Sequence, residues 1–322
     1  MMNNLDTFFD SFVLRLSENY PRDSKLYLYA DYFELVSLFN KDTVITVSEM
    51  LDRLKDEGMI KRNTDIENQA EQNDKDEIFV REVFNLLKQR SQSFSNDYPF
   101  ACFDESLSFI DTLYAKQKIY IFLLLASNLN LFKDYQSVIT TEFEIISKKA
   151  LESYLPKFAE VKNFGKNSEF TGSACEKVRK LADCMNLTVD EKYLGSVSSK
   201  GTQDLGLDIV AWLPMEDNIG NFISVFAQCA CGKEWNKKLN ETRRYNNFLK
   251  LYLSKITHSL FIPYSLINYN DSVFYEHHEF GEAILLFERK RILSLIEDGN
   301  IFNNLDSNSL IEKCIAFKED IV

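Results

Sequence analysis

Two short apolar runs joined by a polar turn constrain the fold of this chain more than any other feature. The runs are "LDIVAWL" at 207–213 and "FISVFAQCA" at 222–230, and both are rich in β-branched and aromatic residues. Such segments are typical of buried strands, and the turn-forming residues between them predict an antiparallel hairpin. Asp208 opens the first run and Gln228 lies inside the second. Burying these polar groups costs free energy unless other groups compensate for it, so both positions need an explanation.

The segments around the hairpin predict a mixed core of helices and strands. The stretch 167–186 has apolar residues at helical spacing along one side, and 234–256 predicts a long basic helix. The apolar run at 259–267 predicts a further strand, and 279–299 predicts a closing helix. With a polar, β-like stretch between 187 and 200, the expected order is helix, three strands, helix, strand and helix.

The first half of the chain predicts helices, so the expected fold class is α+β or α/β. We expect a helical, winged-helix-like region at 1–92, a helical scaffold at 93–163, and a domain with a mixed sheet and C-terminal helices at 164–322. The polar stretch at 64–77 contains almost no apolar residues and predicts a loop or linker.

The segment 26–62 has the outline of a winged-helix or helix-turn-helix unit. Its expected recognition helix carries Asp52, Asp56 and Glu57, which phosphate groups repel. A packing or partner-binding role is therefore favoured, and a regulatory DNA-binding role for this segment is the weaker alternative.

Composition excludes several classes of protein. The net charge of −12 argues against a generally basic nucleic-acid binder. The longest apolar run, at 119–126, is too short to span a bilayer, and the opening residues do not resemble a signal peptide. We expect a soluble, cytoplasmic protein with no membrane partner. None of the six cysteines forms a Cys-x-x-Cys pair, so reduced thiols are expected rather than a structural zinc site.

One stretch is basic against this acidic background. Residues 233–255 hold seven Lys or Arg and two Glu. A patch facing nucleic-acid phosphates is one interpretation, and a solvated helix face is the other. The residues that we expect to contact phosphates are Lys237, Lys238, Arg243 and Arg244.

The motif "GLD" at 206–208, the hairpin, "QCACGK" at 228–233 and the basic stretch together resemble the PD-(D/E)XK, or restriction-endonuclease-like, nuclease superfamily. The resemblance covers roughly 165–270. It implies an α-β-β-β-α-β core in which an aspartate begins the second strand. A Glu or Gln lies in the third strand with a lysine two residues later, and a glutamate on the first helix often joins them.

Carried onto this sequence, the resemblance makes Asp208 and Gln228 the ligands of a Mg²⁺ or Mn²⁺ ion. Oxygen ligands of these kinds suit such a cation. The lysine position is occupied by Ala230, and Lys233 lies three residues further along. We expect Lys233 to swing back and stabilise charge on the phosphate.

The first-helix glutamate is less definite. Glu176 is preferred, and Glu169 at the start of the same predicted helix is the alternative. Asp204, four residues before Asp208, is either a further ligand or an ordinary turn residue.

The resemblance implies a magnesium-dependent endodeoxyribonuclease (a hydrolase) of a restriction or antiviral, anti-phage defence type. DNA would be its substrate, a companion ATPase or sensor protein would control it, and a homodimer would cut both strands. The alternative is a catalytically inactive member of the superfamily that acts as a structural or partner-binding subunit, and Ala230 favours that alternative.

Overall fold

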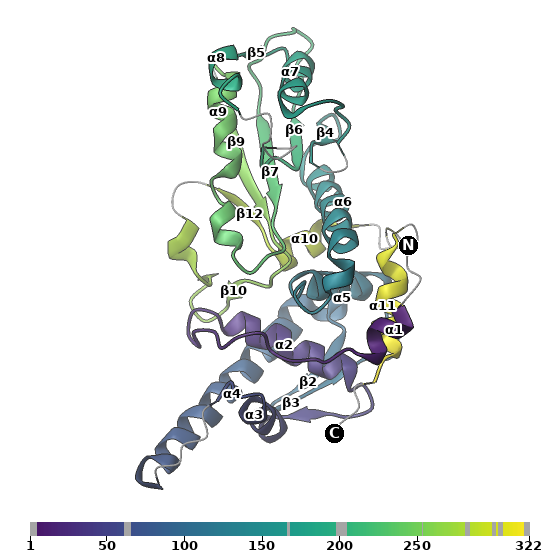
Figure 1. Ribbon diagram of the computed structural model, residues 1–322, viewed down its shortest axis with the longest axis vertical. Coiled ribbons are helices and arrows are strands. Elements are labelled where there is room, and N and C mark those ends of the chain that lie inside the picture. Colours follow the sequence, from purple (N-terminus) through teal and green to yellow (C-terminus); the bar gives the residue numbers. More distant parts are fainter. Residues whose placement is uncertain are drawn as a thin grey trace. The chain divides into compact units, whose positions relative to one another are not determined.

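The computed structural model describes residues 5–60, 66–165, 168–197, 205–252, 254–280, 284–297, 301 and 305–318 (Figure 1). The chain folds into two compact units. Unit 1 contains Met1–Asp134, Tyr264–His277 and Gly299–Val322, and unit 2 contains Tyr135–Pro263 and His278–Asp298. The division after residue 134 falls between the expected boundaries at 92 and 163.

Unit 2 is built on a mixed sheet of five strands. The strands are β4 (Glu160–Asn163), β6 (Ile209–Trp212), β7 (Ser224–Cys229), β9 (Ile256–Phe261) and β12 (Leu285–Phe287), in the spatial order β12-β9-β7-β6-β4. β6 runs antiparallel to both of its neighbours, β4 and β7, whereas β9 runs parallel to β7 and β12 runs parallel to β9. The fold class is therefore α+β with a mixed sheet, and the predicted hairpin of β6 and β7 is confirmed.

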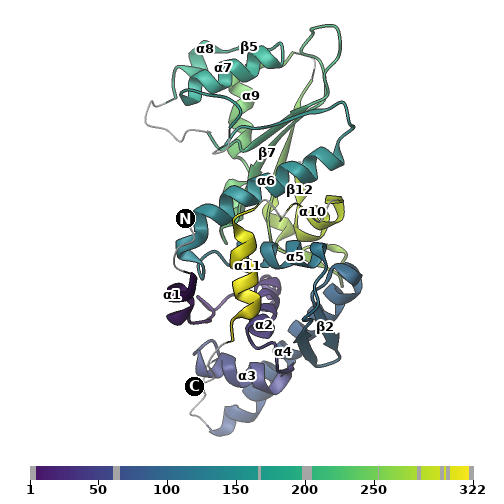
Figure 2. The same cartoon turned by 90° about the vertical axis from the view of Figure 1, so that its right-hand side faces the viewer.

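Helices cover this sheet. α6 (Gln136–Tyr154) packs against β4, β7 and α10 (Arg289–Leu295), and it runs beside the strands in both views (Figures 1 and 2). α7 (Ala174–Cys184) and α9 (Tyr245–Phe248) enclose an apolar core with the sheet. α8 (Glu191–Leu194) and a two-stranded pair, β5 (Thr188–Val189) with β8 (Leu249–Lys250), complete this side. Core residues include Val178, Leu181, Val210, Phe226 and Tyr245.

One predicted helix of unit 2, at 234–256, is wrong, and the helix predicted at 279–299 forms over only part of that range. The stretch 234–256 forms η3 (Trp235–Lys238), η4 (Glu241–Arg244), α9 and β8 before β9 begins. Four asparagines interrupt it, and their side chains compete for backbone hydrogen bonds, which disfavours a long helix. The stretch 279–299 contains the end of η5 (His277–Phe280), then β12 and α10. The side chain of Glu288 caps α10 by accepting from the N–H of Arg291, so the apolar residues before it are left to join the sheet.

Unit 1 begins with α1 (Leu5–Asp10), α2 (Leu26–Phe39), β1 (Ile45–Thr46), α3 (Val47–Asp56) and α4 (Ile66–Phe94). The turn η1 (Ser95–Asp97) leads to a hairpin of β2 (Phe100–Phe103) and β3 (Ser106–Phe109), which extends β1 into a sheet of order β1-β3-β2. α5 (Ala115–Ala126) follows, and η2 (Lys133–Tyr135) ends this stretch. The hairpin of β10 (Ile267–Asn268) and β11 (Val273–Phe274) and the helix α11 (Ser307–Ala316) complete the unit.

The loop predicted at 64–77 is wrong from Ile66 onward, where α4 begins. Its polar residues support a helix because they pair at i,i+4 spacing. Lys75 contacts Glu71 at 2.7 Å, and Gln72 donates to Asp76 at 3.0 Å. Residues 64 and 65 lie outside the described residues. In the part of the chain that the structure describes, no helix is both long and apolar enough to cross a bilayer.

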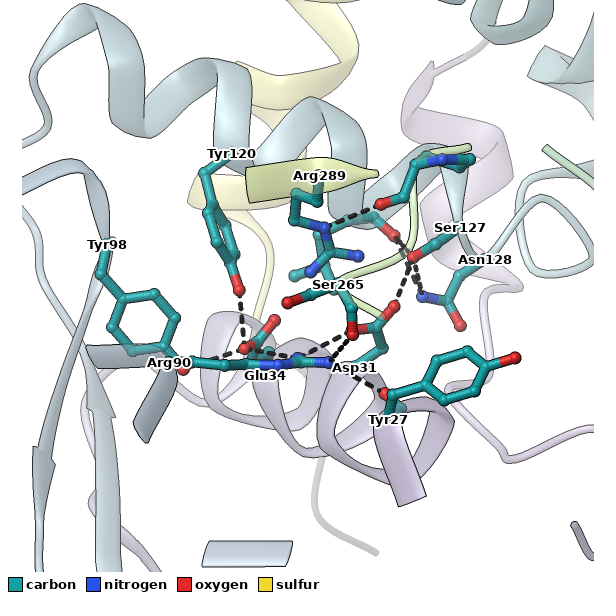
Figure 3. A network of polar contacts seen from close by, with 12 residues as sticks. Tyr27, Asp31, Glu34, Arg90, Tyr98, Tyr120, Ser127, Asn128, Ser265 and Arg289 are labelled. Carbon is teal, nitrogen blue, oxygen red and sulfur yellow. Dashed lines mark hydrogen bonds and ion pairs between the residues drawn. The ribbon is translucent and has the colours of Figure 1, made fainter. Parts of the chain in front are cut away.

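A buried polar network holds α2, α4 and α5 together in unit 1 (Figure 3). Arg90 is fully buried, and its Nη1 lies 2.8 Å from both Asp31 Oδ1 and Glu34 Oε1. The hydroxyls of Tyr98 and Tyr120 donate to the same Glu34 oxygen at 2.9 and 2.8 Å. Buried charged side chains need ion-pair and hydrogen-bond partners to offset the loss of solvent. Because these partners come from different helices, the network fixes how α2, α4 and α5 pack together.

Candidate active site

Three neighbouring strands of the unit 2 sheet, β4, β6 and β7, begin or end close to one another at the same end of the sheet. Asn163 at the end of β4 is paired with Ile209 at the start of β6, which is paired with Ala227 near the end of β7. Because these strands are antiparallel, the residues just beyond these pairs come together. A cavity of about 400 Å³ lies there. It is lined by Glu144, Gly206, Asp208, Gln228, Cys229, Lys238, Glu241 and Arg244.

Asp208 is fixed by both of its neighbouring strands. Its N–H donates to the carbonyl of Ala227 at 3.0 Å, and its own carbonyl accepts from the N–H of Phe164 at 2.7 Å. The side-chain Oδ2 accepts from the N–H of Cys229 at 2.7 Å. The strand ends therefore set the position of this carboxylate before any ligand is considered.

A second carboxylate approaches Asp208 from helix α6. A Cβ placed on Gly165 would lie 2.7 Å from Asp208 Oδ1 and 3.3 Å from Glu144 Oε2. The two carboxylates thus flank one point that only a residue without a side chain leaves open. The pKa of the Cys229 thiol is raised well above its ordinary value. Burial is the largest cause, and the charges of Asp208 and Glu144 come next. Negative charge is therefore concentrated at this end of the sheet.

Gln228 lies across the hairpin from Asp208 and is 5% exposed. Its Nε2 donates to Glu241 Oε2 at 2.7 Å, and Lys238 Nζ lies 3.0 Å from Glu241 Oε1. Gln228 Oε1 is buried and has no hydrogen-bond partner among the described residues. The Gln228 Oε1 is therefore an unused acceptor in the site that also holds the carboxylates of Asp208 and Glu144.

The chain matches no protein-family model, no curated protein and no solved structure.

The donor set at this site suits a hard divalent cation. The carboxylates of Asp208 and Glu144 and the side-chain carbonyl of Gln228 offer oxygen ligands, and Mg²⁺ and Mn²⁺ accept carboxylate and carbonyl ligands while keeping several waters. Nowhere in the described residues do three or more His, Cys, Asp or Glu side chains form a group that could hold a metal ion. The unused Gln228 oxygen nevertheless makes a third oxygen donor available, so the residues fit such a cation.

The structure brings together some of the predicted site residues. Asp208, Gln228 and Lys238 line the cavity with Arg244, whereas Lys233 is not among the lining residues. Lys237 is exposed and paired with Glu234. Arg243 is half-buried near His258, whose pKa its charge helps to lower. Asp204 lies outside the described residues.

The two candidates for the first-helix glutamate lie elsewhere. Glu176 is exposed at the start of α7, where it forms a reciprocal cap with Ser173. Glu169 is exposed and lies 2.8 Å from Lys148. Neither residue lines the cavity, so these two expectations are not supported by the geometry.

Glu144 could not be predicted from the sequence because strand β4 could not. The four residues "EVKN" are too short and too polar to predict a strand, so the sequence pattern predicts the helix after them as the first helix of the core. The order along the chain instead places α6 before β4, β6 and β7. Glu241 was missed as well, since its charge looked like part of a basic, solvated helix.

A buried lysine of α7 contacts the backbone at Gly165, next to Asp208. Lys177 of α7 is 7% exposed, and its Nζ donates to the carbonyl of Gly165 at 3.4 Å. The ring of Phe164 lies beneath the ammonium at 5.9 Å. These contacts help to hold the Phe164–Gly165 backbone against Asp208.

Proposed function

We propose that unit 2 is a divalent-metal-dependent nuclease core of the restriction-endonuclease-like type. With α7, β5 and α8 inserted between β4 and β6, and β8 before β9, its core elements follow in the order α6, β4, β6, β7, α9 and β9, with the last strand parallel to the third. This order is the one that the superfamily resemblance implies. The observation that carries the proposal is the convergence of Asp208, Glu144 and Gln228 on one cavity.

In this proposal Asp208, Glu144 and the Gln228 carbonyl oxygen hold a Mg²⁺ or Mn²⁺ ion. The ion supplies Lewis-acid polarisation of a phosphodiester and lowers the pKa of an attacking water. Asp208 keeps its place because the Cys229 N–H fixes one of its oxygens. Gly165 keeps the space between the two carboxylates open.

Lys238 and Arg244 supply the positive charge that a phosphate needs. Both are exposed at the rim of the acidic cavity. Lys238 takes the role expected of the lysine that Ala230 replaces, because an ammonium at the rim stabilises charge developing on phosphate oxygens. The Arg244 guanidinium binds a backbone phosphate.

DNA is the proposed substrate, in a restriction or anti-phage defence role, with a second copy of the chain or a companion ATPase or sensor as partner. Unit 1 is proposed to bind that partner rather than DNA. Its α3 helix and β2–β3 turn expose acidic residues that phosphates repel. These are Asp52, Asp56, Asp104 and Glu105.

A second candidate is a catalytically inactive core that serves as a structural or partner-binding subunit. The alanine at position 230 favours it, and so does the lack of a group of three metal-binding acids among the described residues. The two candidates share the fold and differ in the chemistry of the cavity.

A cleavage assay with a matched pair of α6 variants separates them. The purified full-length chain is incubated with supercoiled plasmid or single-stranded DNA and with Mg²⁺, Mn²⁺ or a chelator. Glu144→Gln is expected to abolish metal-dependent cleavage. Glu152→Gln, which alters a half-buried glutamate that pairs with Lys149 on the same helix and does not line the cavity, is expected to leave it unchanged. If the wild type and both variants show the same metal-dependent DNA cleavage, or none of them cleaves DNA, the result would support the inactive subunit.

A further inference from the structure

The contact between Gln228 and Glu241 fixes which end of the Gln228 amide faces the cavity. A carboxylate carries no proton and can only accept hydrogen bonds. With Nε2 held 2.7 Å from Glu241 Oε2, the amide must turn its nitrogen toward Glu241. Its oxygen is then the buried atom that has no partner in the described part of the chain.

Glu241 is itself held in place from two sides. Lys238 Nζ contacts its other carboxylate oxygen at 3.0 Å. Gly206 has a φ of +76°, and a Cβ there would lie 2.7 Å from the Glu241 Cβ and 2.6 Å from Oε2. Only glycine meets both conditions, so the backbone before Asp208 leaves room for this carboxylate.

We propose that Glu241 is a positioning residue that presents the Gln228 carbonyl oxygen to the divalent cation held with Asp208 and Glu144. This inference rests on the proposed function of the cavity. It also explains why position 228 holds glutamine. A glutamate there would put a second carboxylate 2.7 Å from Glu241 Oε2, and like charges at that distance disfavour each other's ionisation.

The test measures Mn²⁺ binding to the full-length chain by titration calorimetry. Glu241→Asp keeps the charge but shortens the side chain, so the amide loses its fixed partner. We expect a Mn²⁺ affinity about 10- to 100-fold weaker, which is the usual effect of removing a residue that orients a metal ligand. Glu234→Asp is the matched control, because Glu234 is exposed on the same segment and does not line the cavity. It should bind Mn²⁺ like the wild type.

An exchange of the two side chains provides the rescue. In Glu241→Gln alone either amide can donate to the other, so the Gln228 oxygen is no longer held toward the cavity and Mn²⁺ binding should weaken. The double variant Gln228→Glu with Glu241→Gln restores one N–H to carboxylate bond in the reverse direction, keeps the net charge, and again turns an oxygen to the cavity. It should recover most of the affinity.

The outcomes separate this inference from the proposed function. If Asp208→Asn abolishes Mn²⁺ binding while Glu241→Asp binds like the wild type, the positioning role is overturned and the cation site stands. If the wild type binds no Mn²⁺, both are overturned.

Discussion

Oδ2 of Asp208 accepts a hydrogen bond from the backbone N–H of Cys229 at 2.7 Å, which links the start of β6 to the end of β7. The other oxygen, Oδ1, faces the open point beside Gly165. One atom of this carboxylate therefore joins the two strands, and the other faces the space beside Gly165.

This division predicts different stabilities for two variants of Asp208. Asparagine keeps an oxygen that can accept from the Cys229 N–H, whereas alanine leaves that N–H unsatisfied. We expect Asp208→Ala to lower the free energy of unfolding by about 1.5–3 kcal/mol, as for a lost hydrogen bond to a charged group. Asp208→Asn should cost clearly less. Urea denaturation measures both, and equal losses would show that the contact does not stabilise the hairpin.

Gly165 should tolerate no side chain. The added Cβ of Gly165→Ala would lie 2.7 Å from Asp208 Oδ1, which is too close for any real contact. The carboxylate must then move, and Mn²⁺ binding should fall at least about 10-fold, as when a residue that orients a metal ligand is disturbed. Gly232→Ala is the control, because nothing lies within 4 Å of a Cβ at that position. A Gly165→Ala protein that binds Mn²⁺ normally would contradict the geometry of this site.

Arg90 should be essential for the stability of unit 1. Arg90→Met removes the guanidinium that contacts both buried carboxylates, Asp31 and Glu34. We expect a loss of about 3–5 kcal/mol in the free energy of unfolding. Lys88→Met on the same helix removes an exposed pair with Asp104 and should cost no more than about 1 kcal/mol. Similar losses for the two variants would contradict the importance of burial here.

His258 should make stability depend on pH. Burial first, and then the charge of Arg243, lower its pKa from 6.5 to about 4. Asn246 Nδ2 can only donate and lies 3.1 Å from Nε2, so Nδ1 carries the proton and donates to Thr242 at 3.0 Å.

Because the folded pKa is depressed, the unfolded chain binds the proton more readily. The contribution of His258 is therefore complete above pH 6.5 and is lost as the pH falls toward about 4. Urea unfolding of the wild type and of His258→Gln across this range should show a steeper loss for the wild type. Parallel curves would mean that His258 is not kept neutral by the fold.

The hairpin could be predicted from sequence because its signals are local. The β6 and β7 segments combine β-branched and aromatic residues with a turn between them, so the opposed positions of Asp208 and Gln228 followed from strand pairing. The α4 helix was missed over its first turns because its residues are polar, and i,i+4 pairs rather than an apolar stripe support it.

The rest of the site depends on contacts that are distant in sequence. Glu144 reaches Asp208 only because β4 pairs with β6, and β4 is too short to predict. Glu241 reaches Gln228 because the predicted basic helix is broken into short turns. In both places tertiary packing outweighs local propensity.

The most direct test of the cation site is DNA cleavage by the wild type and by Asp208→Asn in the presence of Mn²⁺. The asparagine can keep the hydrogen bond from Cys229 while removing the negative charge, so the fold is preserved and only the cation site changes. We predict Mn²⁺-dependent cleavage by the wild type that a chelator stops, and a loss of at least about 100-fold in the variant. Cleavage at the same rate by both proteins, or none by the wild type, would contradict the proposed nuclease site.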